Sequence, residues 1–217
     1  MKQLTPPTIT VPEIPDRFSA IDPLDGRYYD KETAKYLSER SRVGYQAHLE
    51  AALAQALADE GVCSQVIADE IVVASGKIKI EDVEQEERTT KHDIKAVVNT
   101  IKALISDEAK PFVHFGATSN DIISSATALQ LRTTTLELVV PRIDKLMSTL
   151  IELSERYADT TQIGRTHGQH GVPITFGYYL SGYVSRLGTS RMALVDLANN
   201  LRGKFSGAVG AYNALSL

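Results

Sequence analysis

The chain has 217 residues, of which 43% are hydrophobic and 23% are charged, and its formal net charge is −4 at pH 7. Because this charge is ordinary for a globular protein, it argues against a nucleic-acid or membrane-surface partner, and no run of 18 apolar residues predicts a membrane span. The single cysteine, Cys63, excludes an intrachain disulfide and a cysteine-based zinc cage, which fits a reducing, cytoplasmic setting.

The N-terminal segment is rich in proline and threonine and lacks the apolar stretch of a signal peptide. Its prolines at positions 6, 7, 12 and 15 predict an extended arm over residues 1–16, mobile unless a partner holds it. We expect an N-terminal helical domain over residues 17–111. Within it, helices are predicted over residues 31–60, ending at Gly61, and near residues 64–75, closed by Gly76.

A further helix of this domain carries a regular apolar stripe from residue 94 to residue 105. The stripe consists of Ile94, Val97, Val98, Ile101, Leu104 and Ile105. Continued backwards it meets polar residues, so the helix is predicted to bend or restart just before KHDIK, residues 91–95. On a regular helix His92 would lie about 160° from the stripe, so it is either solvated or faces a cleft.

Residues 112–217 are predicted to form the first part of a central bundle of long helices, so the fold class is all-α. From Asp121, steps of four and three residues meet a mostly apolar seam: Ile122, Ala126, Leu129, Thr133, Leu136, Val140, Ile143, Met147, Leu150, Ser154 and Tyr157. Pro141 should kink this helix. A second seam follows: Leu180, Val184, Leu187, Arg191, Leu194, Ala198 and Leu201.

These two segments predict an antiparallel helical hairpin whose connection is GRTHGQHG, residues 164–171. One such hairpin leaves most of its apolar seam exposed, so other helices must cover it, from further sequence or from other subunits. The sequence stops at GAVGAYNALSL without a terminal helix or polar tail, and we therefore expect it to be an N-terminal portion.

Three motifs besides KHDIK concentrate polar chemistry. In DPLDGRYYD, residues 22–30, Arg27 and Tyr28 are either turn residues in solvent or an anion clamp. In HFGATSNDI, residues 114–122, Thr118, Ser119 or Asn120 can cap the long helix, whose N-terminus is also an anion site, with His114 beside it.

The third motif, GRTHGQHG, is interpreted as a glycine-permitted loop that presents Thr166, His167 and Gln169 to a ligand. Metal binding would require more ligands than His167 and His170. Because the sequence holds no HExxH motif or carboxylate cluster, no metal site is predicted.

Taken in order, SAIDPLDGRYYDK, TTKHDIKAV, VHFGATSNDI, GRTHGQ and GKFSGAVGAYN resemble the fumarase/aspartase superfamily of lyases across nearly the whole chain. Asn120 and His170 depart from commoner forms of these motifs. The resemblance implies a cofactor-independent enzyme that eliminates fumarate from adenylosuccinate, leaving AMP, and from the succinyl-carboxamide ribotide of purine synthesis. It also implies a homotetramer whose active sites each draw on three subunits.

The resemblance further implies roles for individual residues. His167 would be the general acid, supported by His92, with Lys91, Asp93, Thr166 and Gln169 in the substrate site. Thr118 and Ser119 would bind the fumaryl carboxylate, and Arg27 with Tyr28 the nucleotide phosphate. The base would be a serine on a loop of the C-terminal half, outside this sequence, so residues 1–217 alone should be inactive.

Two alternatives stay open at this point. One is another reaction of the same superfamily, such as cleavage of a different succinyl adduct or a cycloisomerisation. The other is a helical oligomerisation module without catalytic activity.

Overall fold

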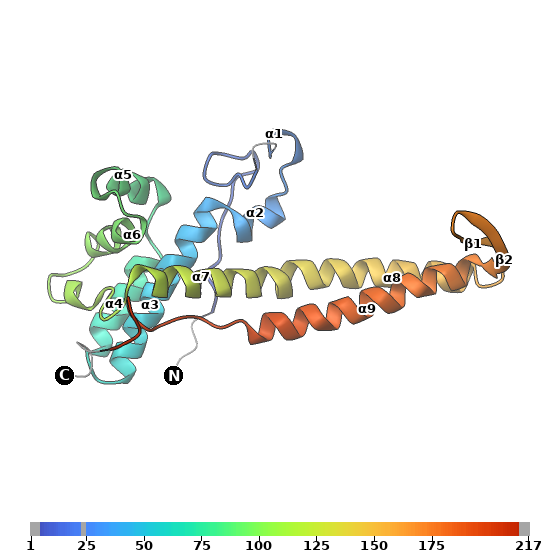
Figure 1. The fold of residues 1–217 in the computed structure, drawn as a ribbon. Coiled ribbons are helices and arrows are strands. Elements are labelled where there is room, and N and C mark those ends of the chain that lie inside the picture. Colours follow the sequence, from blue (N-terminus) through green and yellow to red (C-terminus); the bar gives the residue numbers. More distant parts are fainter. Residues whose placement is uncertain (1–4, 23–24, 213–217) are drawn as a thin grey trace. The chain divides into compact units, whose positions relative to one another are not determined.

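The computed structural model describes residues 5–22 and 25–212, with only the backbone for Asp25 and Gly26. The start of the expected arm, two residues of DPLDGRYYD and the last five residues lie outside the described part. The chain forms two compact units (Figure 1). Unit 1 comprises residues 1–133 and 201–217, and unit 2 comprises residues 134–200. The boundary between residues 111 and 112 stays a prediction about functional domains, because the two compact units meet at other positions, after residue 133 and after residue 200.

Unit 1 is helical throughout its regular structure. Its elements are α1 (Asp25–Tyr28), α2 (Lys31–Leu37), α3 (Glu39–Asp59), α4 (Gln65–Ser75), α5 (Ile80–Thr90), α6 (Asp93–Lys102), the 3-10 turn η1 (Lys110–Phe112) and α7 (Ser119–Thr134). The single helix predicted over residues 31–60 is wrong, because the chain is extended at Ser38. The Ser38 hydroxyl accepts a hydrogen bond from the Ser41 N–H and so begins α3 as a new helix.

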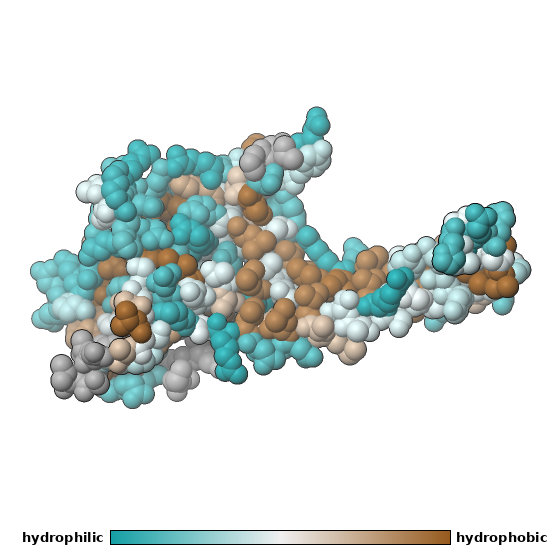
Figure 2. Space-filling model, viewed as in Figure 1, coloured by the Kyte–Doolittle hydropathy of each residue, from teal (hydrophilic) through white to brown (hydrophobic). Residues whose placement is uncertain are grey.

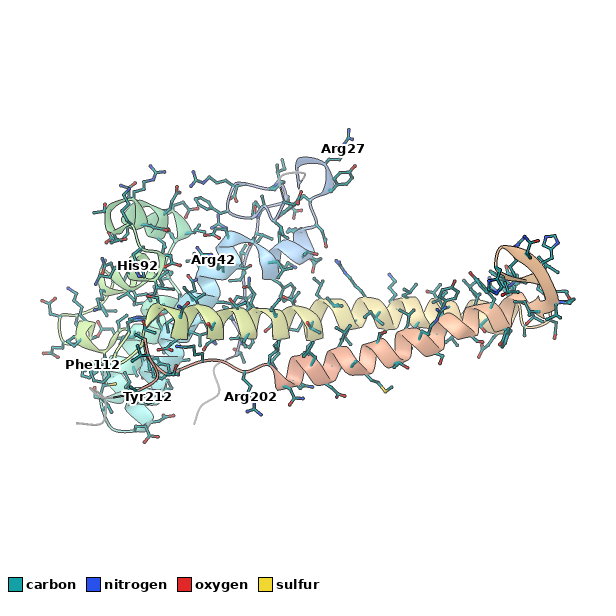
Figure 3. The ribbon with its side chains drawn as sticks, viewed as in Figure 1. Arg27, Arg42, His92, Phe112, Arg202 and Tyr212 are labelled. Carbon is teal, nitrogen blue, oxygen red and sulfur yellow. The ribbon has the colours of Figure 1, made fainter. Side chains whose placement is uncertain are left out.

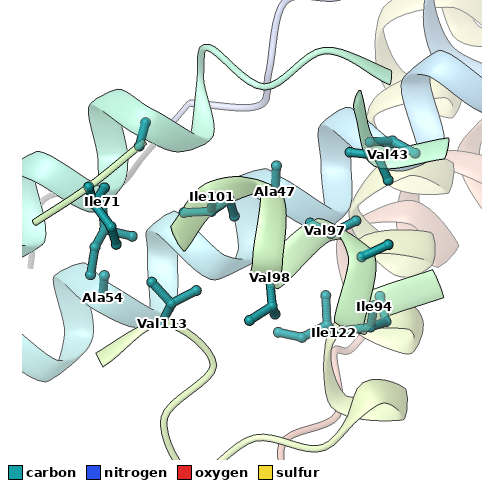
Figure 4. Packing of buried hydrophobic residues seen from close by; sticks show 14 of the residues in the cluster. Val43, Ala47, Ala54, Ile71, Ile94, Val97, Val98, Ile101, Val113 and Ile122 are labelled. Carbon is teal, nitrogen blue, oxygen red and sulfur yellow. The ribbon is translucent and has the colours of Figure 1, made fainter. Parts of the chain in front are cut away.

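The core of unit 1 forms where α3, α4 and α6 pack together (Figure 4). The predicted stripe on α6 is confirmed at Ile94, Val97, Val98 and Ile101, all of which are buried. Leu104 is 52% exposed, because α6 ends at Lys102 and the chain no longer keeps the helical period there. Side chains from α3 and α4, among them Val43, Ala47, Ala54 and Ile71, complete this core.

The described part of the N-terminal arm, residues 5–12, has no helix or strand. Contacts with the rest of the chain hold it. Val11 is buried, and the Tyr29 hydroxyl donates a hydrogen bond to the Pro12 carbonyl over 3.0 Å. An ion pair between Glu13 and Lys31 adds a further contact.

A buried carboxylate at the start of α7 joins this helix to the segment that returns to unit 1 after residue 200. Asp121 accepts hydrogen bonds from the N–H groups of Thr118, Ser206 and Gly207 over 2.9–3.0 Å and forms an ion pair with Lys204. Burial alone would raise the pKa of Asp121, but these donors outweigh it and lower the pKa from 3.8 to about 2. The returning segment 204–207 is therefore fixed to the first turn of α7.

Unit 2 is a helical hairpin with a small β-ribbon at its turn. Its elements are the π-helical turn η2 (Thr135–Val139), α8 (Val140–Arg156), β1 (Thr161–Thr166), β2 (Gln169–Thr175) and α9 (Phe176–Asn200). A π-helical turn, Thr135–Val139, precedes α8, which has Pro141 in its first turn, and the kink expected at Pro141 stays a prediction. Outside the β-ribbon, the described residues have only helices as regular structure, so the all-α class holds.

The two predicted seams face each other in this hairpin, since α8 packs along α9. Arg191 occupies a seam position on α9 and forms a bidentate ion pair with Asp144 of α8. Where the two helices meet the β-ribbon, Gly177 lies so close to α8 that an added Cβ would be 2.3 Å from the Ser154 carbonyl oxygen. Only glycine fits there, and the Ser154 hydroxyl donates to the Gly177 carbonyl over 2.8 Å.

Much apolar surface of the hairpin faces outward, as the sequence predicts for a hairpin alone. Figure 2 shows hydrophobic residues at this surface. The exposed large hydrophobic and aromatic side chains of α8 and α9 include Leu146, Ile151, Tyr178, Tyr179, Tyr183, Met192 and Leu197. Within the described residues, no helix combines the length and apolar character needed to cross a membrane.

Asp121→Asn should lower the free energy of unfolding by about 2–4 kcal/mol at pH 7, since it leaves the Lys204 ammonium without its buried carboxylate. Because the folded pKa lies below 3.8, ionised Asp121 stabilises the fold above pH 4, and this contribution is lost as the pH falls towards 2. Urea unfolding of both proteins between pH 7 and pH 2 measures the effect. The matched control Asp107→Asn, at an exposed carboxylate paired with Lys110, should change little. A difference between wild type and Asp121→Asn that does not shrink below pH 4 would contradict this account.

Candidate active site

The junction between α5 and α6 presents the KHD residues at a helix break. Lys91 ends α5 in the left-handed region with φ of 54°, and His92 is the extended N-cap of α6. The predicted restart of the helix is therefore confirmed. The position assumed for His92 on the helical surface is wrong, because His92 precedes the first turn and is not on the helix.

Both ring nitrogens of His92 have close neighbours. Its Nδ1 lies 3.3 Å from the Lys95 N–H, which donates to it, and its Nε2 lies 3.3 Å from the Ser119 hydroxyl. The neutral tautomer that satisfies both contacts has its proton on Nε2 and donates it to Ser119. Asp93 Oδ1 lies 3.4 Å from Nδ1 and becomes a partner only when the ring is protonated.

The first turn of α7 lies beside His92. Thr118 directly precedes α7 and Ser119 begins it. The Asp121 carboxylate reaches back to the Thr118 N–H, so the turn that carries Thr118 and Ser119 is fixed from its own helix. The structure thus brings together five predicted site residues in unit 1: Lys91, His92, Asp93, Thr118 and Ser119.

A cavity of about 320 Å³ opens beside this group, and cationic side chains line it. His92, Ser119, Lys95, Lys102 and His114 face this cavity together with apolar residues. Burial lowers the pKa of Lys102, and the nearby charge of Lys95 lowers it further, whereas Glu50 opposes the shift. An anion in the cavity would relieve the repulsion between the two lysines. Their spacing of seven residues, which places them on one face of α6, was a signal in the sequence.

His114 is held by a buried carboxylate that sequence reasoning missed. Glu50 of α3 is buried, and its Oε1 lies 2.6 Å from His114 Nδ1. The second oxygen, Oε2, is buried and has no hydrogen-bond partner within the described part of the chain. His114 has a left-handed backbone with φ of 65°, which is uncommon for a residue other than glycine. Nothing in the sequence around Glu50 distinguishes it from a solvent-exposed helical glutamate, so its pairing with His114 could not be predicted.

Arg27 and Tyr28 take no part in the hydrogen bonds of this group. They lie on α1, where Tyr28 is 67% exposed and Arg27 extends into solvent (Figure 3). The structure therefore leaves the predicted anion clamp open, with both side chains accessible.

The remaining predicted residues lie in unit 2, where the expected loop is a β-hairpin. Strands β1 and β2 pair antiparallel, with Thr166 opposite Gln169. His167 and Gly168 form the two-residue turn, with φ of 52° and 70°. Positive φ at both positions is the requirement of a type I′ turn, which explains why glycine follows the histidine. The interpretation of this segment as an irregular loop is wrong, because residues 161–166 and 169–175 are paired β-strands. The sequence did not reveal them, because glycines and a proline interrupt the alternation of apolar and polar residues that is typical of a strand.

The tip of this hairpin presents its polar side chains to solvent. Thr166, His167 and Gln169 are exposed. Thr166 and Arg165 also line an open cavity of about 560 Å³ on the hairpin, together with Tyr179. The predicted site residues thus form one group in each unit, and Arg27 and Tyr28 on α1 belong to neither group. Among the described residues, no set of three or more histidine, cysteine, aspartate or glutamate side chains is placed to hold a metal ion.

Comparison with known proteins defines the class. The sequence pattern of the lyase family, described as "Lyase", matches residues 22–217. The chain belongs to this family of lyases, and the resemblance read from its motifs is confirmed.

Similar curated proteins are adenylosuccinate lyases. That of Archaeoglobus fulgidus is 36% identical over 195 residues, and that of Pyrococcus horikoshii is 37% identical over 194 residues. These alignments cover 89% and 88% of this chain but 43% of each relative. The chain therefore spans less than half the length of these relatives.

Solved structures of the superfamily share the fold. A fumarate lyase from a Mesorhizobium species matches with a TM-score of 0.77 at 30% identity, covering 86% of this chain and 44% of that one. The 3-carboxy-cis,cis-muconate lactonizing enzyme of Pseudomonas putida matches with a TM-score of 0.78 at 30% identity, covering 89% and 45%. The predicted superfamily fold is confirmed by these structures.

A double-mutant cycle tests the contact between Glu50 and His114. His114→Ala should be strongly destabilising, because it leaves a buried carboxylate without its partner, and the further change Glu50→Ala should recover part of that loss. We expect a coupling of about 1.5–3 kcal/mol from urea unfolding of the four proteins. Additive effects of the two substitutions would show that the imidazole and the carboxylate do not interact in solution.

Proposed function

We propose that residues 1–217 supply part of the active site of a C–N lyase that releases fumarate from adenylosuccinate and from the succinyl-carboxamide ribotide of purine synthesis. The observation that carries this proposal is the contact between His92 Nε2 and the Ser119 hydroxyl at the mouth of a lysine-lined cavity. The curated relatives, named adenylosuccinate lyases, support the choice of substrate.

The substrate's carboxylates match the chemistry of the unit 1 group. A carboxylate at the first turn of α7 accepts hydrogen bonds from Thr118 and Ser119 and gains from the helix dipole. Lys91, Lys95 and Lys102 add positive charge around it. These fixed donors stabilise the negative charge that develops when a proton leaves the carbon next to the carboxylate. Asp93, beside His92, keeps that ring paired when it is protonated.

The acid of the proposed reaction is His167, at the hairpin tip. Elimination requires a proton on the departing nitrogen, and the exposed imidazole of His167 is placed to donate one. Thr166 and Gln169, paired across the turn, are proposed substrate contacts on either side of it. Arg27 and Tyr28, both exposed on α1, are the proposed phosphate contacts. The base is assigned to a serine loop outside residues 1–217, so this chain alone is expected to be inactive.

We further propose that the two groups of site residues meet in a homotetramer, with different subunits supplying them. The support is the exposed apolar surface of α8 and α9, which a partner helix would cover. The presence of the groups in separate units also fits an assembled site.

A second candidate is a cycloisomerase, because the lactonizing enzyme of Pseudomonas putida shares the fold with a TM-score of 0.78. Both reactions use a carboxylate site and proton transfer, so the fold alone does not separate them. Incubation of the full-length enzyme, which includes the sequence beyond residue 217, with adenylosuccinate and, separately, with 3-carboxy-cis,cis-muconate decides between them. Fumarate release from the first, with no lactone from the second, is the expected result.

In the full-length enzyme, His167→Ala should reduce turnover of adenylosuccinate by about 10²–10⁴-fold, because a general acid acts on the chemical step. The matched control is His170→Ala, which removes another exposed histidine of the same hairpin and should retain near-normal turnover. Fumarate release measures both, and the molar mass in solution checks that each variant assembles like the wild type. Near-normal turnover of His167→Ala would overturn the assignment of the acid.

A further inference from the structure

Unit 1 contains a second cavity that is separate from the candidate active site. Its volume is about 490 Å³, within the range of roughly 300–1,000 Å³ typical of small-molecule sites. The N-terminal arm forms one wall through residues 5 and 7–10. Helices α3 and α4 and the start of α5 form the others. None of its lining residues belongs to the two groups proposed for the lyase reaction.

Two buried polar atoms of the lining have no hydrogen-bond partner among the residues that the structure describes. They are the Ser75 Oγ at the end of α4 and the Arg40 Nε near the start of α3. Ser75 is only 7% exposed, and Arg40 uses its Nη2 for ion pairs with Asp16 and Glu81. A buried donor without an acceptor is unfavourable, so a ligand that brings an acceptor would gain both hydrogen bonds.

The rest of the lining combines apolar walls with positive charge. Val43, Ala51 and Val72 supply apolar surface, and the charged lining residues are Arg40 and Lys79. Burial lowers the pKa of His48, so its ring is neutral at pH 7. Among the described residues that line the cavity, none is a carboxylate. The cavity therefore offers donors and cations to a ligand with an apolar body.

We propose that this cavity binds a small organic monocarboxylate. Its carboxylate accepts hydrogen bonds from Arg40 Nε and Ser75 Oγ and is attracted by Lys79. A carboxylate suits these groups because it has two oxygens and acts only as an acceptor when ionised. Its hydrocarbon part lies against Val43, Ala51 and Val72. The bound acid also contacts the arm, so it couples the arm to α3 and α4.

Matched pairs of acid and amide test the chemical class of the ligand. The probes are hexanoate, benzoate and 4-phenylbutyrate, each beside its neutral carboxamide, and titration calorimetry measures binding to the purified protein. We expect at least one acid to bind about tenfold or more tightly than its amide, as the loss of a charge-assisted hydrogen bond predicts. Equal binding of acid and amide would overturn the proposal, and so would the absence of binding by all three acids.

Matched variants place the acid in this cavity. Val72→Phe should fill the cavity and abolish binding, whereas Val73→Phe, at the adjacent exposed position of α4, should leave it unchanged. Lys79→Gln should weaken binding about tenfold, with Lys77→Gln as the control outside the lining. Ser75→Ala should weaken acid binding without destabilising the free protein, because it removes an unpaired hydroxyl. Binding that survives Val72→Phe would place the acid elsewhere and refute the proposal.

The same variants separate this inference from the proposed lyase function. Because none of these residues belongs to the candidate active site, fumarate release by the full-length enzyme should be the same with Val72→Phe as in wild type. A protein that releases no fumarate but binds the acid would overturn only the lyase proposal.

Discussion

The ion pair between the buried Asp121 carboxylate and the partly exposed Lys204 is the interaction on which the rest of unit 1 depends. One ionised carboxylate accepts hydrogen bonds from the turn before α7 and from the segment that returns at Ser206 and Gly207. The turn it fixes carries Thr118 and Ser119, and Ser119 contacts His92 at the start of α6. The Asp121 carboxylate therefore connects the returning segment to the turn that carries the proposed substrate site. The same hydrogen bonds and the ion pair with Lys204 lower the pKa of this buried side chain to about 2.

Several unusual backbone conformations lie at proposed functional positions. Among the described residues other than glycine, Lys91, His114, His167 and Tyr212 have left-handed backbones, and the first three lie in or beside a proposed site group. Such conformations cost free energy and persist only where the surrounding structure imposes them. At Lys91 the left-handed turn ends α5 and frees His92 to cap α6. At His167 it closes a two-residue turn and leaves the imidazole in solvent.

Much of this arrangement was predictable from sequence periodicity. The stripe from Ile94 to Ile101 and the seams of α8 and α9 gave the right helical faces, because burial follows the 3.6-residue repeat. The break at Ser38 was missed, since a serine inside an alanine-rich segment is also compatible with a continuous helix. The β-hairpin around His167 was missed because glycines obscure its alternation. Glu50 was beyond sequence reasoning, because its partner His114 lies 64 positions away and only tertiary packing brings them together.

The central claim is that His92 and His167, which lie in separate units, serve one active site supplied by different subunits. Subunit complementation tests this claim most directly. Full-length enzymes that carry His92→Ala or His167→Ala are purified separately, mixed under conditions that allow subunit exchange, and assayed for fumarate release, while native mass spectrometry confirms mixed oligomers. Each variant alone should be nearly inactive, and the mixture should regain substantial activity, because some sites then combine an intact His92 from one subunit with an intact His167 from another. Mixed oligomers that remain as inactive as the separate variants would contradict the account.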